Sequence, residues 1–301
     1  MIIDVHAHYY PQPYMEAIGR ADVPSPAAAP LGGQSIEERL ALMDAVGVDR
    51  QILSVSQAQP YLADARDAAA AARLGNDLYD ELCQRYPDRF SYFAALPLAH
   101  MDESLAEIER VSASRHVVGY TIGCSIGDLQ LDDPIFTPLY EELDRRSSTL
   151  FLHPVGQGRA SFLAGQNLAW SVGATFEDTA AALRLVYADV PSRFARMSII
   201  VPHLGGTLPF LLSRLVRKGG ESVVAALQSF YYDTVSGSPD ALRCTCASFG
   251  ADRLLFGTDY PFCDAEEFAE HLRYLNDVAL SPSELDAIHA TIAEELLHLT
   301  S

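Results

Sequence analysis

The chain has 301 residues, of which 49% are hydrophobic and 20% charged, a composition that excludes disorder, a collagen helix and a coiled coil. Its formal net charge of −19 would repel a nucleic acid backbone, so nucleic acid is not an expected partner. No apolar stretch reaches the roughly 18 residues of a membrane span, and the first residues do not form a signal peptide. The sequence therefore predicts a cytoplasmic globular protein without membrane contact, whose five scattered cysteines stay reduced.

Eight short apolar runs recur along the chain, each followed by turn residues and an amphipathic segment. We predict them as strands at residues 2–5, 51–55, 90–96, 117–122, 149–152, 197–201, 230–235 and 253–256. The runs are almost continuously apolar, as are strands of a parallel sheet that is covered on both faces. Because neither a repeat nor a low-complexity linker divides the chain, we expect one domain over residues 1–301.

The segments between these runs carry helix-end signals. Ser35 precedes two glutamates and Gly47 follows the apolar stripe, which predicts a helix between these two residues. Asp133-Pro134 and Ser281-Pro282 each place a capping residue before a proline at the first helical position. Eight alternating strand and helix units predict an α/β protein, a (β/α)₈ TIM barrel with extra C-terminal helices. An open doubly wound sheet is the alternative, because alternation alone does not establish closure.

Five polar residues stand where four of the predicted strands end. His6 and His8 close the first run, His153 closes the fifth, His203 closes the sixth, and Asp259 follows the eighth. In a TIM barrel the carboxyl ends of the strands form the mouth where the active site is built. The sequence therefore predicts that these five side chains meet at one end of the barrel.

The residue types at this mouth are those that bind a divalent metal ion. His6 and His8 are two residues apart on one strand, so both imidazoles point to the same side. Imidazole and carboxylate together suit zinc or manganese. Lys218 is the only lysine, and it lies at a predicted helix end, so chemistry that needs a lysine is not expected.

Other catalytic motifs are absent. The sequence contains no Gly-x-Ser-x-Gly, no His-Glu-x-x-His and no phosphate-binding loop, and Ser161 stands where a dinucleotide fingerprint requires its third glycine. We therefore expect no organic cofactor. Gly205 and Gly206 follow the sixth run, where their amides could hold an anion or their small size could allow close packing; both interpretations stay open.

With these residues the chain resembles the amidohydrolase superfamily, in the branch of metal-dependent decarboxylases related to aminocarboxymuconate semialdehyde decarboxylase. The resemblance covers nearly the whole chain and is most specific at residues 257–262, Gly-Thr-Asp-Tyr-Pro-Phe. It implies one metal ion, zinc before manganese, and a homodimer. The predicted fourth strand lacks the lysine that bridges two metals in binuclear members, which favours a single ion. The ligands that the resemblance implies are His6, His8, His153 and Asp259, with His203 as acid/base.

The resemblance also implies a pocket for a small carboxylic acid. Phe262 and Trp170 would line it, and Arg159 is the candidate partner of the substrate carboxylate, with a plain surface arginine as the alternative. We expect a carboxy-lyase that releases CO₂ from a small hydroxyaromatic or unsaturated acid, with His203 as proton source and Asp259 assisting. One alternative is a hydrolase that attacks a lactone, ester or amide with metal hydroxide. Another is a metal-binding barrel without activity.

Overall fold

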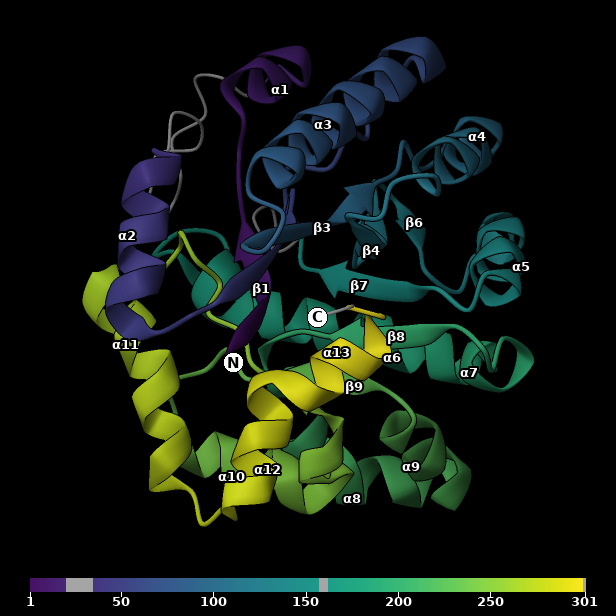
Figure 1. Ribbon diagram of the computed structural model, residues 1–301. Helices are drawn as coiled ribbons and strands as arrows, with labels where there is room; N and C mark the ends of the chain where they lie inside the picture. The colour runs from purple at the N-terminus through teal and green to yellow at the C-terminus, as the bar shows by residue number, and fades with distance from the viewer. Residues whose placement is uncertain (20–34, 157–161, 300–301) are drawn as a thin grey trace.

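The computed structural model describes residues 1–19, 35–156 and 162–299. In this part of the chain, eight parallel strands lie side by side in chain order (Figure 1). They are β1 (Ile3–His8), β2 (Arg50–Ser54), β3 (Phe90–Ala95), β4 (Val117–Gly123), β7 (Thr149–His153), β8 (Ser198–Val201), β9 (Tyr231–Asp233) and β10 (Leu254–Leu255). All eight predicted strands are confirmed, each within a few residues of its expected bounds.

The two edges of this sheet meet. The amide of Val5 in β1 donates to the carbonyl of Phe256, just after β10, at 2.9 Å. Further along, Ala7 and Tyr260 form a parallel bridge. The sheet therefore closes into the predicted barrel and is not an open doubly wound sheet.

Helices connect the strands and surround the barrel (Figure 1). The α-helices are α1 (Gln12–Ala17), α2 (Ile36–Val46), α3 (Ala65–Arg85), α4 (Met101–Val111), α5 (Thr137–Arg145), α6 (Ala174–Tyr187), α7 (Val190–Arg193), α8 (Leu208–Gly219), α9 (Glu221–Gln228), α10 (Pro239–Phe249), α11 (Ala265–Arg273), α12 (Pro282–Asp286) and α13 (Ile292–Leu296). Short 3₁₀ or π turns are η1 (Pro134–Phe136), η3 (Ala169–Gly173), η4 (His203–Gly205), η5 (Ala251–Arg253), η6 (Tyr274–Asp277) and η7 (Ala287–Thr291), and β5 (Ser125–Ile126) pairs with β6 (Leu129–Gln130) in a small hairpin. Among the described residues, no helix is long and apolar enough to cross a bilayer.

The predicted helix ends are present. The Ser35 hydroxyl accepts a hydrogen bond from the amide of Glu38, and Gly47 ends α2 in the left-handed conformation with φ of 84°. Asp133 caps the short turn η1 before α5, and Ser281 begins α12 with a complete capping box. Capping residues bind backbone groups that a helix end leaves unpaired. Their effect is therefore local and does not depend on where the helix packs.

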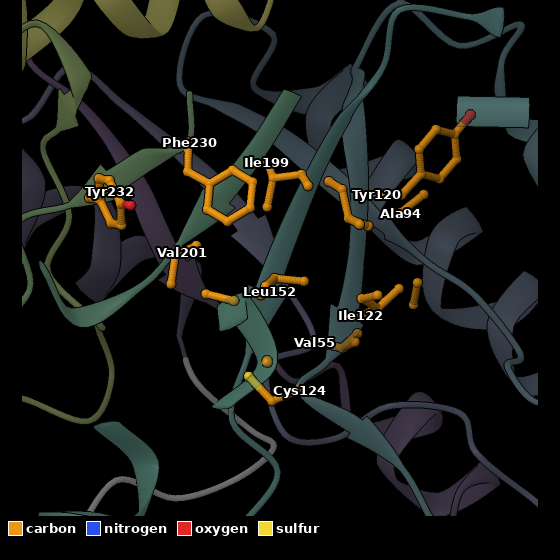
Figure 2. Close-up of a cluster of buried hydrophobic side chains, with 14 of the residues drawn as sticks. Val55, Ala94, Tyr120, Ile122, Cys124, Leu152, Ile199, Val201, Phe230 and Tyr232 are labelled. Atoms are coloured by element: carbon orange, nitrogen blue, oxygen red, sulfur yellow. The ribbon is translucent and has the colours of Figure 1, made fainter. Parts of the chain in front are cut away.

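Buried apolar side chains form two layers, one on each side of the strands. In β7, Leu150 and Leu152 belong to the layer between strands and helices, where Leu152 lies near Ile122 and Val201 (Figure 2). Phe151, between them, belongs to the layer inside the barrel. Successive side chains of a strand point to opposite faces. Burial of both faces explains why the strands are almost continuously apolar in sequence.

The interior layer is closed by the C-terminal helices. Ala293 and Leu297, in and just after α13, pack with Ile3 and Val5 of β1 inside the barrel. The Thr149 hydroxyl, at the start of β7, donates to the carbonyl of Leu296 at 3.4 Å, which places α13 at the amino ends of the strands. The expected extra C-terminal helices therefore close the end of the barrel opposite the predicted site.

Candidate active site

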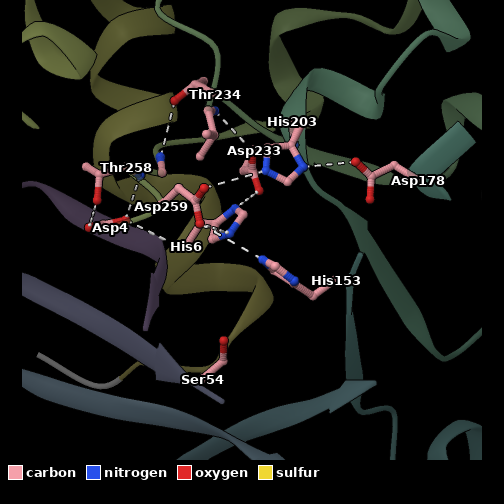
Figure 3. A network of polar contacts seen from close by, with 12 residues as sticks. Asp4, His6, Ser54, His153, Asp178, His203, Asp233, Thr234, Thr258 and Asp259 are labelled. Carbon is pink, nitrogen blue, oxygen red and sulfur yellow. Dashed lines mark hydrogen bonds and ion pairs between the residues drawn. The ribbon is translucent and has the colours of Figure 1, made fainter. Parts of the chain in front are cut away.

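The barrel brings four of the predicted side chains together at the carboxyl ends of the strands (Figure 3). They offer one ligand atom each, all within 4.8 Å of one another, and they are His6, His8, His153 and Asp259. The three imidazoles are buried and the carboxylate is partly exposed. In the described part of the chain, this is the one group of His, Cys, Asp or Glu that meets the geometry of a metal site. Cys244 and Cys246 do not form such a group.

A register irregularity in β1 directs both of its histidines into the barrel. The pairing of β1 with β2 shifts between Asp4 and Ala7. Val5 packs in the interior layer, and the ring of the next residue, His6, also meets the interior Phe151 at 5.1 Å between centroids. Two consecutive inward side chains require such a bulge, because a regular strand alternates. The sequence predicted that His6 and His8 share a side, but it did not reveal the bulge.

The fourth ligand candidate, Asp259, has an unfavourable backbone conformation. Its φ of 60° lies in the left-handed region, which costs a non-glycine residue on the order of 1 kcal/mol or more. Neighbouring hydrogen bonds hold it: the Asp259 amide donates to the carbonyl of His6 at 2.8 Å, and the His8 amide donates to the carbonyl of Tyr260 at 2.7 Å. Strand β1 thereby fixes the position of the carboxylate.

The other ring nitrogens of the three histidines are engaged. Nδ1 of His6 donates to Asp233 Oδ2 at 2.6 Å, and Nδ1 of His153 donates to the carbonyl of Pro154 at 2.8 Å. Nδ1 of His8 is hydrogen bonded to Ser54 Oγ at 2.8 Å. Each Nε2 therefore faces the common centre, as is usual for metal-binding histidines, although Nε2 of His153 also lies 3.1 Å from Ser56 Oγ.

The three Nε2 atoms converge on one carboxylate oxygen. The distances to Asp259 Oδ1 are 3.1 Å from His6, 2.9 Å from His8 and 3.9 Å from His153. Three imidazoles and one carboxylate around a common point are a donor set that fits one divalent metal ion with room for a further ligand.

The charges in this group respond to burial and to one another. Burial lowers the pKa of His6, but Asp233 and Asp259 outweigh it and raise the value to about 9. Burial holds the pKa of His8 well below its usual value. Burial raises the pKa of Asp259, but His6 and the other imidazoles hold it well below the usual range. The raised pKa favours a second proton on His6, which competes with a metal ion for Nε2.

His203 lies beside the four ligand candidates and is held from behind. Its Nδ1 donates to Asp178 Oδ2 at 2.9 Å, and its amide donates to Asp233 Oδ1 at 2.8 Å. Its Nε2 is 3.8 Å from Asp259 Oδ2, so this nitrogen faces the site. Burial lowers the pKa of His203, but the Asp178 and Asp259 carboxylates together outweigh it and raise the pKa well above the usual value. The raised pKa favours the protonated imidazole, and Nε2, which faces the site, is placed to donate a proton.

Close packing accounts for the glycines that follow His203. A Cβ on Gly206 would lie 2.2 Å from the carbonyl oxygen of Thr175, and one on Gly205 would lie 2.8 Å from the Tyr232 ring. Both glycines also have positive φ. The packing interpretation is therefore sufficient, and the Thr207 amide that follows is already used by the Thr179 hydroxyl at 2.8 Å.

Sequence analysis missed two buried carboxylates, Asp178 and Asp233. Asp233 ends β9, so the strand-end rule that selected the histidines would also have selected it. Asp178 lies in the middle of α6, and no local pattern distinguishes it from a solvent-facing helix residue. Only the packing of α6 against the η4 turn, which begins at His203, shows that it contacts His203.

A cavity of about 570 Å³ opens beside the site and is lined by His203, Asp259 and Phe262. The Phe262 ring is 5.8 Å from that of His8, between centroids, which agrees with the expected pocket wall. Trp170 lies in η3, partly buried, and is not among the residues that line this cavity, so its role stays a prediction. Arg159 lies outside the described residues.

Comparison with known proteins agrees with this geometry. The amidohydrolase family model matches residues 3–299. The chain is 29% identical over 287 residues to gamma-resorcylate decarboxylase from Rhizobium radiobacter, covering 87% of each chain. It is 28% identical over 230 residues to 2-amino-3-carboxymuconate-6-semialdehyde decarboxylase from Dictyostelium discoideum, covering 71% of this chain and 63% of the relative.

A solved structure extends the similarity to the whole fold. It is a dihydroxybenzoic acid decarboxylase from Polaromonas sp. with bound manganese and the inhibitor 2-nitroresorcinol. It superposes with a TM-score of 0.83 at 25% identity, covering 99% of this chain and 97% of the other. The arrangement of the barrel is therefore that of a metal-containing decarboxylase.

Proposed function

Because this chain belongs to the amidohydrolase family, we propose that it is a metal-dependent, non-oxidative decarboxylase of a small hydroxyaromatic carboxylic acid. The observation that carries the proposal is the convergence of three imidazoles and the Asp259 carboxylate beside His203. Relatives that match most of the chain support it, because they are decarboxylases of resorcylate and of carboxymuconate semialdehyde. An unsaturated enol acid is the second substrate class to test.

One divalent ion held by His6, His8, His153 and Asp259 would bind and polarise the substrate's oxygens. We propose zinc, because imidazole nitrogen and carboxylate oxygen are its common ligands in a four-coordinate site. Manganese is the competing ion, since the Polaromonas relative binds it. Both ions therefore belong in any assay.

His203 would supply the proton that the reaction consumes. A proton delivered to the ring carbon that bears the carboxylate interrupts conjugation there. The C–C bond then breaks, its electron pair returns to the ring, and CO₂ leaves. The Asp178 carboxylate holds Nδ1–H of His203, so Nε2 of the imidazolium is the nitrogen that would transfer its proton, and Asp259 lies close enough to assist.

The substrate would lie in the cavity beside His203, with its ring against Phe262. None of the described residues that line this cavity is a lysine or an arginine. Arg159 therefore remains our proposed partner for the substrate carboxylate. Replacing Arg159 with Gln would raise KM severalfold and change kcat little, whereas unchanged KM would assign the arginine to the surface.

The test is a product assay on the full chain, with zinc or manganese added back after chelation. The substrates are 2,6-dihydroxybenzoate, other ortho-hydroxybenzoates, enol acids and a set of lactones. We expect CO₂ and the decarboxylated product in mass spectra, in amounts that depend on the metal. Products that gain water would instead establish a hydrolase, and metal retention without turnover would establish a metal-binding barrel.

Three further predictions accompany this function. A homodimer is the assembly that the family resemblance implies, and sedimentation would test it. A single cooperative unfolding transition would support one domain over residues 1–301.

The five free thiols suit a reducing compartment, so a cytoplasmic location stays our prediction.

A further inference from the structure

A buried arginine lies behind the metal-ligand strands. Arg39 of α2 is 1% exposed, although its guanidinium is charged. Burying such a charge is costly unless it is paired and hydrogen bonded, so the position demands an explanation. Arg39 lies on the same helix face as Met43, one turn away, where a core helix ordinarily carries an apolar residue.

The Arg39 guanidinium contacts the backbone of one ligand candidate, His8, and the side chain of the residue that follows another, Asp259. Nη2 donates to the main-chain carbonyl of His8 at 2.5 Å. The guanidinium carbon lies 4.6 Å from the ring centroid of Tyr260, the residue after Asp259. One side chain therefore contacts both the first strand and the loop that follows the last strand.

A second path leads through buried polar side chains. Nη1 of Arg39 donates to Gln51 Oε1 at 2.8 Å, and Gln51 Nε2 donates to Asp4 Oδ2 at 2.9 Å. Both Gln51 and Asp4 are fully buried. The amide of Gln51 thus connects the cation to a carboxylate without direct contact between them, which balances the buried charge.

The carboxylate at the end of this path holds the backbone beside the remaining ligand candidates. Asp4 accepts hydrogen bonds from the Thr258 hydroxyl at 2.7 Å, from the Thr258 amide at 3.1 Å and from the His6 amide at 3.1 Å (Figure 3). Thr258 precedes Asp259, whose left-handed backbone needs support from its neighbours.

We propose that Arg39 is a positioning residue of the metal centre, which acts through His8, Tyr260 and the Gln51–Asp4 path. This inference rests on the proposed metal centre, but it does not depend on the reaction performed there. Arginine suits the role because its planar fork donates in two fixed directions and its flat face stacks on a ring. Lysine would keep the charge and lose that geometry.

Measuring the metal affinity of the full chain would show whether Arg39 positions the metal ligands or only balances the charge of Asp4. We would measure the dissociation constants of Mn²⁺ and Zn²⁺ by competition with a chromophoric chelator for wild type, Arg39→Lys and Arg39→Met. Outer-shell partners of metal ligands change metal affinity about 10- to 100-fold, so we expect Arg39→Lys to bind at least about tenfold more weakly. Arg85→Met is the control, because Arg85 is 69% exposed and its nearest carboxylate is 3.9 Å away.

Each outcome decides the proposal. A folded Arg39→Lys protein with wild-type metal affinity would overturn it. If Arg39→Met does not fold, Arg39→Lys and Gln51→Leu decide, because the first keeps the charge and the second interrupts only the path to Asp4. If wild type binds neither ion, the metal centre itself is wrong. If the variants lose affinity while no substrate releases CO₂, the inference stands and the proposed function fails.

Discussion

The two ends of the barrel use the same inward-facing positions for opposite purposes. In β7, Phe151 and His153 are two residues apart and both face the interior, but Phe151 packs with Ile3 and Val5 whereas His153 faces Asp259. At the amino end, α13 closes an apolar interior. At the carboxyl end, the imidazoles and carboxylates form hydrogen bonds and ion pairs with one another. In β7, the side chain that stabilises the barrel and the side chain that serves the site are therefore only two positions apart.

This contrast separates stability from chemistry between the two ends of the barrel interior. The apolar end supplies stabilisation that is independent of the site, and it leaves the mouth free to hold strained or charged groups. Asp259 and His203 both have positive φ, and both lie at the mouth. Substitutions at the mouth are therefore expected to change chemistry or metal binding, and substitutions at the amino end are expected to change stability.

The largest expected effect is at the mouth. Replacing His203 with Asn should lower kcat by about 100- to 10,000-fold, the contribution of a positioned general acid, and leave the metal content unchanged. Steady-state assays with elemental analysis of the same preparation would check both parts. Full activity in this variant would remove His203 from the mechanism.

At the amino end, Leu297→Ala should act on stability alone. Leu297 is 3% exposed in the interior layer, so its truncation should lower the free energy of unfolding by about 2–5 kcal/mol. Urea unfolding would measure this loss, and kcat per folded molecule should stay at the wild-type value. Ile135→Ala, at a residue 42% exposed, is the matched control. A parallel loss of kcat would show that the two ends are coupled.

The next largest effect is expected at Asp233, which holds the imidazole of the ligand candidate His6. Asp233→Asn removes the charge that holds Nδ1 of His6 but keeps the size of the side chain. Metal affinity should fall about 10- to 100-fold. Chelator competition would measure it against Asp240→Asn, whose carboxylate is 95% exposed and pairs only with its helix neighbour Arg243. Equal affinities in the two variants would contradict the role of Asp233.

The smallest effect lies outside both ends of the barrel. Hydrogen bonds from Arg145 and then Arg146 outweigh partial burial and lower the pKa of Glu142 from 4.5 to about 2. A lowered folded-state pKa means that the stabilisation is complete above pH 4.5 and disappears as the pH falls towards 2. Glu142→Gln should therefore cost at most about 1 kcal/mol at pH 7. Urea unfolding at pH 7 and pH 3 should show this difference shrinking, and a constant difference would contradict it.

Much of the site was predictable because it follows from strand ends. His153 and Asp259 are 106 positions apart in the printed sequence, yet each follows an apolar run, and parallel strands in a barrel bring all such positions to one mouth. Asp178 and Arg39 were not predictable in this way. Both lie on helices, and their contacts depend on how each helix packs against the barrel, which no local pattern records.

The sequence by itself determined the order of strands and helices, their capped ends and the residues at the strand ends, because these depend on local patterns of apolar and polar side chains. The tertiary structure decided that the sheet closes, that a bulge turns both His6 and His8 inward, and that Asp233, Asp178 and Arg39 hold the site. These features depend on distances between segments far apart in the chain, and only folding sets those distances.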